Sequence, residues 1–318
     1  MPAMTALRPI AILGPTAGGK SELAVALAER LGGEVISADS MQVYRRLDAG
    51  TAKPGPGLRA RAVHHLIDIV EPTEPFTAAD WLARADALIE RLRGAGRRPI
   101  VVGGTNLYLK LLLEGMIQGP GRDPELRRRL AELDLDELHD RLARVDPEGA
   151  DRIHRRDRKR LVRALEVHEL TGEPISRRQR QWAEHGGRPK GYRHDALLIG
   201  LRWPVEAVNR RINARVKAMF EPAQAGVESL PAEVARLDAA GLLGPQAREA
   251  LGYKQVLAAL AGRMSLAEAM ERTKVLTRRF AKQQRTWLKR FAGVEWIDAG
   301  DADVERWADE AVRVVHSG

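Results

Sequence analysis

Residues Gly14 to Ser21 form the motif of this chain whose residue types and spacing carry the most specific chemistry. They read Gly14-Pro15-Thr16-Ala17-Gly18-Gly19-Lys20-Ser21 and fit the pattern G-x-x-x-x-G-K-[ST] of a phosphate-binding loop. Backbone N–H groups of such a loop, with the positive end of the following helix, hold phosphate oxygens. Lys20 adds a point charge, and the Ser21 hydroxyl can ligate Mg²⁺. The motif predicts a polyphosphate site without specifying ATP.

The residues around this motif supply the context that a phosphate-binding loop requires. Residues 9–13 have the pattern of a buried strand, and residues 21–31 have the apolar spacing of a helix. An ordinary glycine turn is the alternative, and the complete pattern in this context disfavours it. Hydrolases and kinases of this type usually add an acid at the end of another strand. The strand predicted at 98–102 leads into Gly103-Gly104-Thr105 and has no acid, which is unusual for an ATPase.

Asp39 is the acid best placed to act opposite the phosphates. It follows a strand predicted at residues 34–37, and the carboxyl end of a parallel strand beside the loop faces the same crevice. Asp39 there could bind Mg²⁺ or accept a proton from a nucleophile. The competing role is a helix N-cap, because Asp39 and Ser40 are both good capping residues. Thr105 has two roles open as well, a hydroxyl donor to a phosphate or leaving-group oxygen, or a cap.

The order of the predicted elements indicates an α/β fold. Strands alternate with helices up to residue 102, which predicts a parallel sheet flanked by helices. Residues from 123 to about 181 are almost entirely helix-patterned, and strand-like patterns return at 196–201 and 294–297. We therefore predict a P-loop-type core from residues 1–118 and 196–318, with an all-helical insertion domain at 119–195.

Composition narrows the classes of protein. The chain has 318 residues, no cysteine and a formal net charge of +9, with a sequence pI of about 10.1. No apolar run approaches the roughly 20 residues of a membrane-spanning helix, and no signal peptide is visible, so we expect a cytoplasmic protein without a membrane role. The lack of cysteine excludes disulfides and thiolate metal sites. Nothing in the sequence calls for an obligate protein partner.

Two basic segments favour nucleic acid as a partner. Residues 152–163 hold seven basic residues and one acid, and residues 272–290 hold eight basic residues, no acid, and the aromatic residues Phe280 and Trp287. Lysine and arginine contacts to phosphates supply sequence-independent affinity, and aromatic side chains can stack on unpaired bases. The alternative is a pair of solvated helix faces with their aromatic residues turned toward the core.

Taken together and in this order, the motifs resemble those of the tRNA dimethylallyltransferases, also called tRNA isopentenyltransferases. The resemblance covers nearly the whole chain and departs from the usual family pattern at His154-Arg155-Arg156-Asp157, where His-Pro-Asn-Asp is common. The matching stretches are GPTAGGKS at 14–21, ISADSMQVYRRLDAGTAKP at 36–54, HHLIDIVEPTEPFTAADW at 64–81, VVGGTNLYLKLLLEG at 101–115, RIHRRDRKRLVRALEVHELTGEPIS at 152–176, LGYKQ at 251–255 and AKQQRTWLKR at 281–290.

The resemblance implies transfer of a dimethylallyl group from dimethylallyl diphosphate to N6 of the adenosine 3′-adjacent to the anticodon, with release of diphosphate. It implies that Asp39 is the general base, that Thr105 supports the bridging oxygen, and that Lys20, Ser21 and Mg²⁺ neutralise the leaving group. The diphosphate would lie on Gly14, Pro15, Thr16, Ala17, Gly18, Gly19, Lys20, Ser21 and Arg215, although arginines spaced as Arg211 and Arg215 are also common on solvated helix faces.

The resemblance also implies that the anticodon stem-loop of tRNA is the macromolecular partner, with the target base flipped out of its stack. The implied tRNA contacts are Asp39, Ser40, Met41, Gln42, Thr105, Arg127, Arg163, Ala164, Leu165, Glu166, Val167, Gly252, Lys254, Gln255, Lys282, Gln283, Arg285 and Trp287. Two other functions compete with this prediction. One is a P-loop kinase acting on a small molecule or a nucleotide with Asp39 as base, and the other is an RNA-binding protein switched by a nucleotide.

Overall fold

The computed structural model describes residues 7–116, 119–186, 191–221, 228–300 and 303–317. The chain divides into two compact units. The core unit comprises residues 1–112 and 194–318, and the insertion unit comprises residues 113–193. The sequence predicts boundaries at 118/119 and 195/196, which lie six and two residues beyond those of the structure, 112/113 and 193/194.

The centre of the core unit is a six-stranded sheet in the order β3-β2-β4-β1-β5-β6, with every pair parallel. A parallel sheet covered on both faces needs strands that are apolar on both sides, as the fully buried sequence IAIL of β1 shows. The predicted fold class is confirmed. The strands are β1 (Ile10–Leu13), β2 (Gly33–Ser37), β3 (His64–His65), β4 (Arg98–Val102), β5 (Leu197–Arg202) and β6 (Val294–Asp298).

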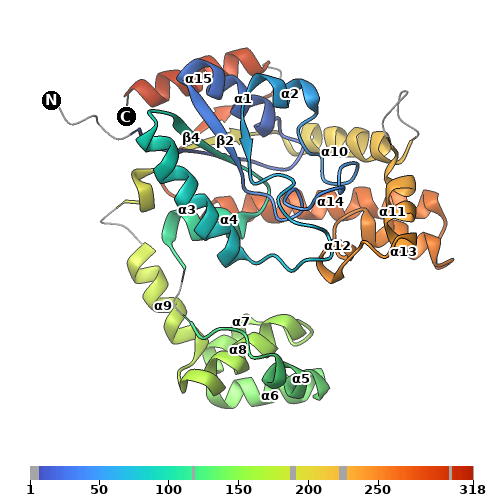
Figure 1. Ribbon diagram of the computed structural model, residues 1–318. Coiled ribbons are helices and arrows are strands. Elements are labelled where there is room, and N and C mark those ends of the chain that lie inside the picture. Colours follow the sequence, from blue (N-terminus) through green and yellow to red (C-terminus); the bar gives the residue numbers. More distant parts are fainter. Residues whose placement is uncertain (1–6, 117–118, 187–190, 222–227, 301–302, 318) are drawn as a thin grey trace. The chain divides into compact units, whose positions relative to one another are not determined.

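Helices cover both faces of this sheet (Figure 1). On one face α1 (Lys20–Leu31) packs against α15 (Val304–Ser317), and on the other lies α3 (Ala78–Gly94). Trp81 of α3 is fully buried and stacks on Tyr108 of α4 (Asn106–Glu114), with 4.6 Å between the ring centroids. Its indole N–H donates a hydrogen bond of 2.8 Å to the Ser37 carbonyl. This bond fixes the end of β2, two residues before Asp39.

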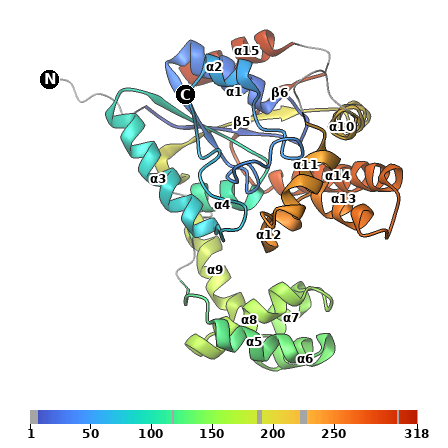
Figure 2. The ribbon, with the colours of Figure 1, turned by 45° about the vertical axis from the view of Figure 1, so that its right-hand side comes forward.

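A second group of helices lies beside the sheet in the core unit (Figure 2). The long helix α14 packs against both α10 and α13, and α11 packs against α13. Ser265 and Glu268 form a capping box that starts α14. The bounds of this group are α10 (Val205–Phe220), α11 (Leu230–Ala239), α12 (Pro245–Arg248), α13 (Tyr253–Leu260) and α14 (Leu266–Leu288). The short helix α2 (Pro56–Arg61) packs against α1 instead.

The described part of the insertion unit is helical, as predicted for this stretch. Its core is a cluster of buried leucines that includes Leu130, Leu142 and Leu161. Aspartates cap the N-termini of its first four helices with their side chains, which is the local signal that separates these short helices. The helices are α5 (Pro124–Glu132), α6 (Leu135–Val145), α7 (Pro147–Arg152), α8 (Arg158–Thr171) and α9 (Ile175–Gly186).

Candidate active site

The phosphate-binding loop connects β1 to α1, as its sequence predicts. Gly19 has a φ of +81°, and a Cβ at this position would lie 2.7 Å from the Trp307 ring, so only glycine fits. The Lys20 ammonium is buried and donates to the Pro15 carbonyl at 2.8 Å, across the loop. Burial, with the nearby positive charge of Arg215, lowers the pKa of Lys20 to about 8. An anion bound beside this lysine would oppose the lowering of its pKa and favour the charged form.

A cavity of about 980 Å³ lies in front of this loop in the core unit. It brings together most of the predicted phosphate-binding residues, the predicted base and residues of α10 and α14. Its volume is at the upper end of the range for small-molecule sites, which leaves room for more than a diphosphate. The predicted site residues on its lining are Thr16, Ala17, Gly18, Gly19, Lys20, Ser21, Asp39, Ser40, Met41, Gln42, Thr105, Arg215 and Gln283.

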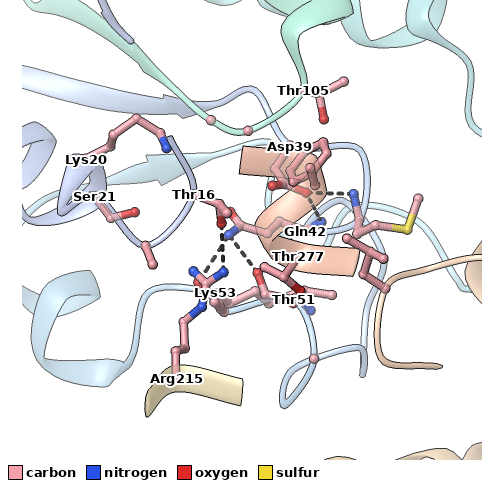
Figure 3. A pocket seen from close by; sticks show the side chains of 18 of the residues that line it. Thr16, Lys20, Ser21, Asp39, Gln42, Thr51, Lys53, Thr105, Arg215 and Thr277 are labelled. Atoms are coloured by element: carbon pink, nitrogen blue, oxygen red, sulfur yellow. Dashed lines mark hydrogen bonds between the residues drawn. The ribbon is translucent and has the colours of Figure 1, made fainter. Parts of the chain in front are cut away.

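Asp39 borders the cavity across from Lys20 and Ser21 (Figure 3). Its Oδ1 accepts hydrogen bonds from the backbone N–H groups of Met41, at 2.9 Å, and Gln42, at 3.3 Å. Asp39 thus caps a turn rather than an α-helix, and one oxygen does so, while Oδ2 has no hydrogen bond among the described residues. Burial raises the pKa of Asp39, although these hydrogen bonds and the charges of Lys20 and Arg215 oppose the rise. The two roles considered for Asp39 are therefore compatible.

The loops that follow β2 and β4 are joined directly to each other. Gly103 approaches Ala38 so closely that a Cβ would lie 2.1 Å from the Ala38 carbonyl oxygen. The Thr105 N–H donates to that oxygen at 3.1 Å, and the Thr105 hydroxyl accepts from the Ser40 N–H at 2.9 Å. The same hydroxyl lies 3.2 Å from the Ser40 hydroxyl and donates to it. Thr105 therefore helps to fix the turn that carries Asp39 while it borders the cavity.

Arg211 and Arg215 of α10 both border the cavity but differ in how far they are buried. Arg211 is exposed, lies over the Trp203 ring at 4.8 Å and donates to the Ala17 carbonyl at 2.7 Å. Arg215 reaches the cavity and donates from Nη2 to the Thr16 hydroxyl at 2.7 Å (Figure 3). Its Nε is buried without a hydrogen-bond partner in the described part of the chain, and burial lowers its pKa. Arg215 therefore has the environment of an anion-binding residue rather than of a solvated helix face.

The other predicted tRNA contacts of the core unit lie on three elements. The Gln42 amide donates to the Thr51 and Ala52 carbonyls at 3.2 Å each, which orders the loop after β2. Gln255 accepts from the Gly252 N–H at 2.9 Å and so caps α13, next to the exposed Lys254. On α14, the side chains of Lys282 and Gln283 are exposed. The Nη1 of Arg285 is buried and has no hydrogen-bond partner among the described residues. The Trp287 ring lies beneath the charged groups of Lys110 and Arg290.

The predicted contacts of the insertion unit form a closed ionic network. Glu166 is fully buried and accepts two hydrogen bonds from Arg127, at 2.7 and 2.8 Å, one from Arg163 at 2.6 Å and one from the Asp123 N–H at 2.9 Å. Burial alone would raise the pKa of Glu166, yet these hydrogen bonds lower it to about 2. The remaining predicted contacts of this helix are buried side chains: Ala164, Leu165 and Val167.

Sequence reasoning missed several side chains that shape the cavity. Lys53 is almost fully buried and bonds to Asp68 at 2.5 Å, to Tyr44 O at 2.7 Å and to Asp48 at 2.8 Å. Glu233 of α11 accepts from the N–H groups of Asp48 and Ala49 and from the Tyr253 hydroxyl. Lys53 carried a signal, since it lies in the polar stretch Thr51-Ala52-Lys53-Pro54. Glu233 carried none, because the Asp48 and Ala49 N–H groups that it binds lie 185 and 184 residues away.

The described residues show neither a cluster of metal-binding side chains nor a membrane-spanning helix. They contain no group of three or more histidine, aspartate or glutamate side chains arranged to hold a metal ion. In the same part of the chain, no helix combines the length and the apolar character that crossing a bilayer requires.

A parallel sheet, a glycine loop that ends in a buried lysine, and a facing carboxylate define a P-loop α/β protein. Comparison with known proteins then gives the family. The sequence model of the family described as IPP transferase matches residues 42–291, and that described as isopentenyl transferase matches residues 8–58.

A tRNA dimethylallyltransferase of Geobacter sulfurreducens is 48% identical over 294 residues, which is 91% of each chain. A tRNA isopentenylpyrophosphate transferase of Bacillus halodurans has a similar crystal structure, with a TM-score of 0.71, 37% identity, and coverage of 98% of this chain and 96% of that chain. A eukaryotic dimethylallyltransferase acting on tRNA matches with a TM-score of 0.78 and 28% identity over 97% of this chain and 77% of that chain.

The chain belongs to the IPP transferase family, and it is a transferase of the tRNA-prenylating class. The predicted resemblance is confirmed. The competing prediction of a small-molecule or nucleotide kinase is not favoured.

Proposed function

We propose that this protein transfers the dimethylallyl group of dimethylallyl diphosphate to N6 of the adenosine 3′-adjacent to the anticodon of tRNA. One observation carries the proposal: a phosphate-binding loop and a carboxylate with a raised pKa face each other across one cavity, in a chain whose relatives are named for this reaction. The cavity is large enough to admit a purine as well as the diphosphate.

Asp39 is proposed as the general base. The exocyclic amine of adenine is a poor nucleophile, because its lone pair is delocalised into the ring. As the C–O bond to diphosphate breaks and positive charge spreads over the allyl group, N6 bonds to the terminal allyl carbon and its proton passes to Asp39. Burial raises the pKa of Asp39, which brings it closer to the operating pH and strengthens it as a base.

The diphosphate on the phosphate-binding loop gains one negative charge when the C–O bond breaks, because the bonding electron pair stays on its bridging oxygen. Backbone N–H groups of the loop, the Lys20 ammonium and the Arg215 guanidinium are proposed to stabilise this charge, and Thr105 to support the bridging oxygen. Mg²⁺ is proposed as cofactor, because the cavity offers hard oxygen donors of the type it prefers, the Ser21 hydroxyl and carboxylates. When bound by Ser21 and the diphosphate, it would neutralise part of the leaving-group charge.

The target base must leave its stack to reach Asp39, so the anticodon loop has to be held beside the cavity. We propose that exposed cations of α14 and of the insertion unit contact tRNA phosphates, and that the insertion unit holds the anticodon stem-loop. This assignment rests on the charge of residues 152–163 and 272–290. With tRNA as substrate, we propose that the protein acts in the cytoplasm.

One assay tests the proposal. Unmodified tRNA transcript is incubated with radiolabelled dimethylallyl diphosphate and Mg²⁺, without ATP, and the labelled nucleoside is mapped. We expect label on N6 of the adenosine next to the anticodon, with one diphosphate released per group transferred. Label elsewhere, no label, or a requirement for ATP would contradict the proposal. A transcript with guanosine at the target position is the matched control.

A further inference from the structure

Gln284 is a fully buried amide on the inner face of α14 that joins two loops of the cavity. It is 1% exposed. Its Oε1 accepts from the backbone N–H of Thr16 at 2.7 Å, and its Nε2 donates to the Gly104 carbonyl at 2.9 Å. One side chain therefore connects the phosphate-binding loop to the loop after β4, and both of its hydrogen-bonding ends are used.

Each loop that Gln284 joins carries one half of the proposed chemistry. Thr16 lies in the loop proposed to hold the diphosphate, and its hydroxyl also accepts from Arg215. Gly104 precedes Thr105, whose N–H and hydroxyl fix Ala38 and Ser40 on either side of Asp39. A Cβ built on Gly104 would lie 3.3 Å from Asp39 Oδ2 and 3.3 Å from Gln284 Nε2, so the amide and the carboxylate approach the same point.

We propose that Gln284 is a positioning residue that sets the separation between the diphosphate-holding loop and the proposed base. The inference rests on the proposed function, since it assigns the electrophile to one loop and Asp39 to the other. Bond formation requires that N6 and the allyl carbon lie within about 3–3.5 Å of each other with their orbitals aligned. A misplacement of either atom by about 1 Å can lower the rate about 100-fold. Gln284 does not touch the reacting atoms and acts through Thr16 and Gly104.

A purely structural role makes a different prediction. Any buried amide with two hydrogen bonds stabilises the fold, and its loss lowers the melting temperature wherever it lies. Gln246, a partly buried amide of the same unit, supplies this comparison; its Nε2 donates to the Phe76 carbonyl at 3.2 Å. It accepts from the Phe76 N–H at 2.9 Å and from the Tyr44 hydroxyl at 2.5 Å, and it does not line the cavity.

The experiment compares Gln284→Met, Gln284→Ala and Gln246→Met with the unchanged protein. Methionine keeps most of the volume of glutamine and removes both hydrogen bonds, whereas alanine also removes the volume. For each protein we would measure the single-turnover rate constant with saturating dimethylallyl diphosphate and saturating tRNA. For each protein we would also measure the affinity for tRNA, the affinity for inorganic diphosphate and the melting temperature.

We expect both Gln284 variants to lose about 100-fold in the single-turnover rate constant, with tRNA affinity within about 3-fold. Gln246→Met should lower the melting temperature and leave the rate constant within about 3-fold. A Gln284→Met rate constant within about 3-fold of the unchanged protein, or a defect that saturating substrate removes, would overturn the inference. Absence of prenyl transfer by the unchanged protein would instead overturn the proposed function. The activity of the unchanged protein is therefore measured before that of the variants.

Discussion

Two groups of buried charges, one in each unit, differ in how completely they are paired. In the insertion unit, Glu166 accepts four hydrogen bonds from Arg127, Arg163 and Asp123, and its pKa falls to about 2. In the core unit, Lys20 and Arg215 have lowered pKa values and Asp39 has a raised one, so burial disfavours the charged form of each.

This difference separates a structural ionic network from a binding site. A buried charge whose hydrogen bonds are complete stabilises its own surroundings, and a ligand would have to break those bonds. Where a side chain is desolvated and incompletely paired, its charged form is unfavourable, and a bound ligand of opposite charge stabilises it. The unpartnered Nε of Arg215 belongs to the second kind. The comparison therefore assigns the chemistry to the core unit and a stabilising role to the Glu166 network.

The largest expected effect is that of Asp39→Asn. The amide keeps the size of the side chain but cannot accept the N6 proton, so kcat should fall about 1,000-fold while tRNA affinity changes little. Single-turnover kinetics and tRNA binding measure the two separately. Asp309→Asn, the same change on an exposed acid of α15, is the control and should leave both unchanged. Equal losses of kcat and tRNA affinity would remove the base assignment.

Glu166→Gln tests whether the Glu166 network stabilises the insertion unit. Removing one partner of a buried ionic network costs about 3–5 kcal/mol; the arginine side chains are 31% and 35% exposed, so solvent screening reduces this to about 2–3 kcal/mol. Hydrogen exchange of residues 123–171 would report the loss of stability. Glu137→Gln, in an exposed ion pair with Arg141, should cost less than about 0.5 kcal/mol.

The same network predicts an acid-labile insertion unit. The pKa of Glu166 in the folded chain is about 2, below its ordinary value of 4.5. Its contribution to stability is therefore fully present above about pH 4.5 and is lost as the pH falls toward 2. Glu166→Gln should remove this dependence between pH 4.5 and 2, and unchanged acid sensitivity in the variant would contradict the assignment.

Lys20 predicts proton uptake when diphosphate binds. With a pKa of about 8, Lys20 is mostly charged below that pH, so binding of inorganic diphosphate takes up little proton there. Above pH 8 the lysine must be protonated on binding, and affinity should weaken up to about tenfold per pH unit. Calorimetry in buffers of different ionisation enthalpy measures the uptake. Lys20→Arg, which stays charged, should lose this pH dependence.

The smallest expected effect concerns an exposed cation that belongs to neither buried group. Lys282→Ala should weaken tRNA binding about 3-fold and reduce the slope of log K against log salt by about 1, because one phosphate contact is lost. Lys217→Ala, on an exposed lysine of α10, is the control. An unchanged salt slope for Lys282→Ala would show that this face of α14 does not contact tRNA.

Local patterns were sufficient for most of the fold. The phosphate-binding loop, the strands at β1, β2, β4, β5 and β6, and the helical character of the insertion follow from apolar periodicity, glycines and capping residues. The strand β3 was missed, since a pair of half-buried histidines has no strand pattern. The roles of Asp39, Thr105 and Mg²⁺ stay predictions until the assays above are done.

The sequence by itself determined the family, the glycine loop and the identity of the opposing carboxylate, because each is carried by short motifs whose residues are contiguous in the chain. Only the tertiary structure decided which of these charges are paired and which are not. Glu166 and its arginines, and Gln284 between Thr16 and Gly104, are brought together from positions up to 268 residues apart. Burial, and the hydrogen bonds from distant residues that complete a network, set the pKa values that separate a binding site from a structural network, and both depend on the folded chain.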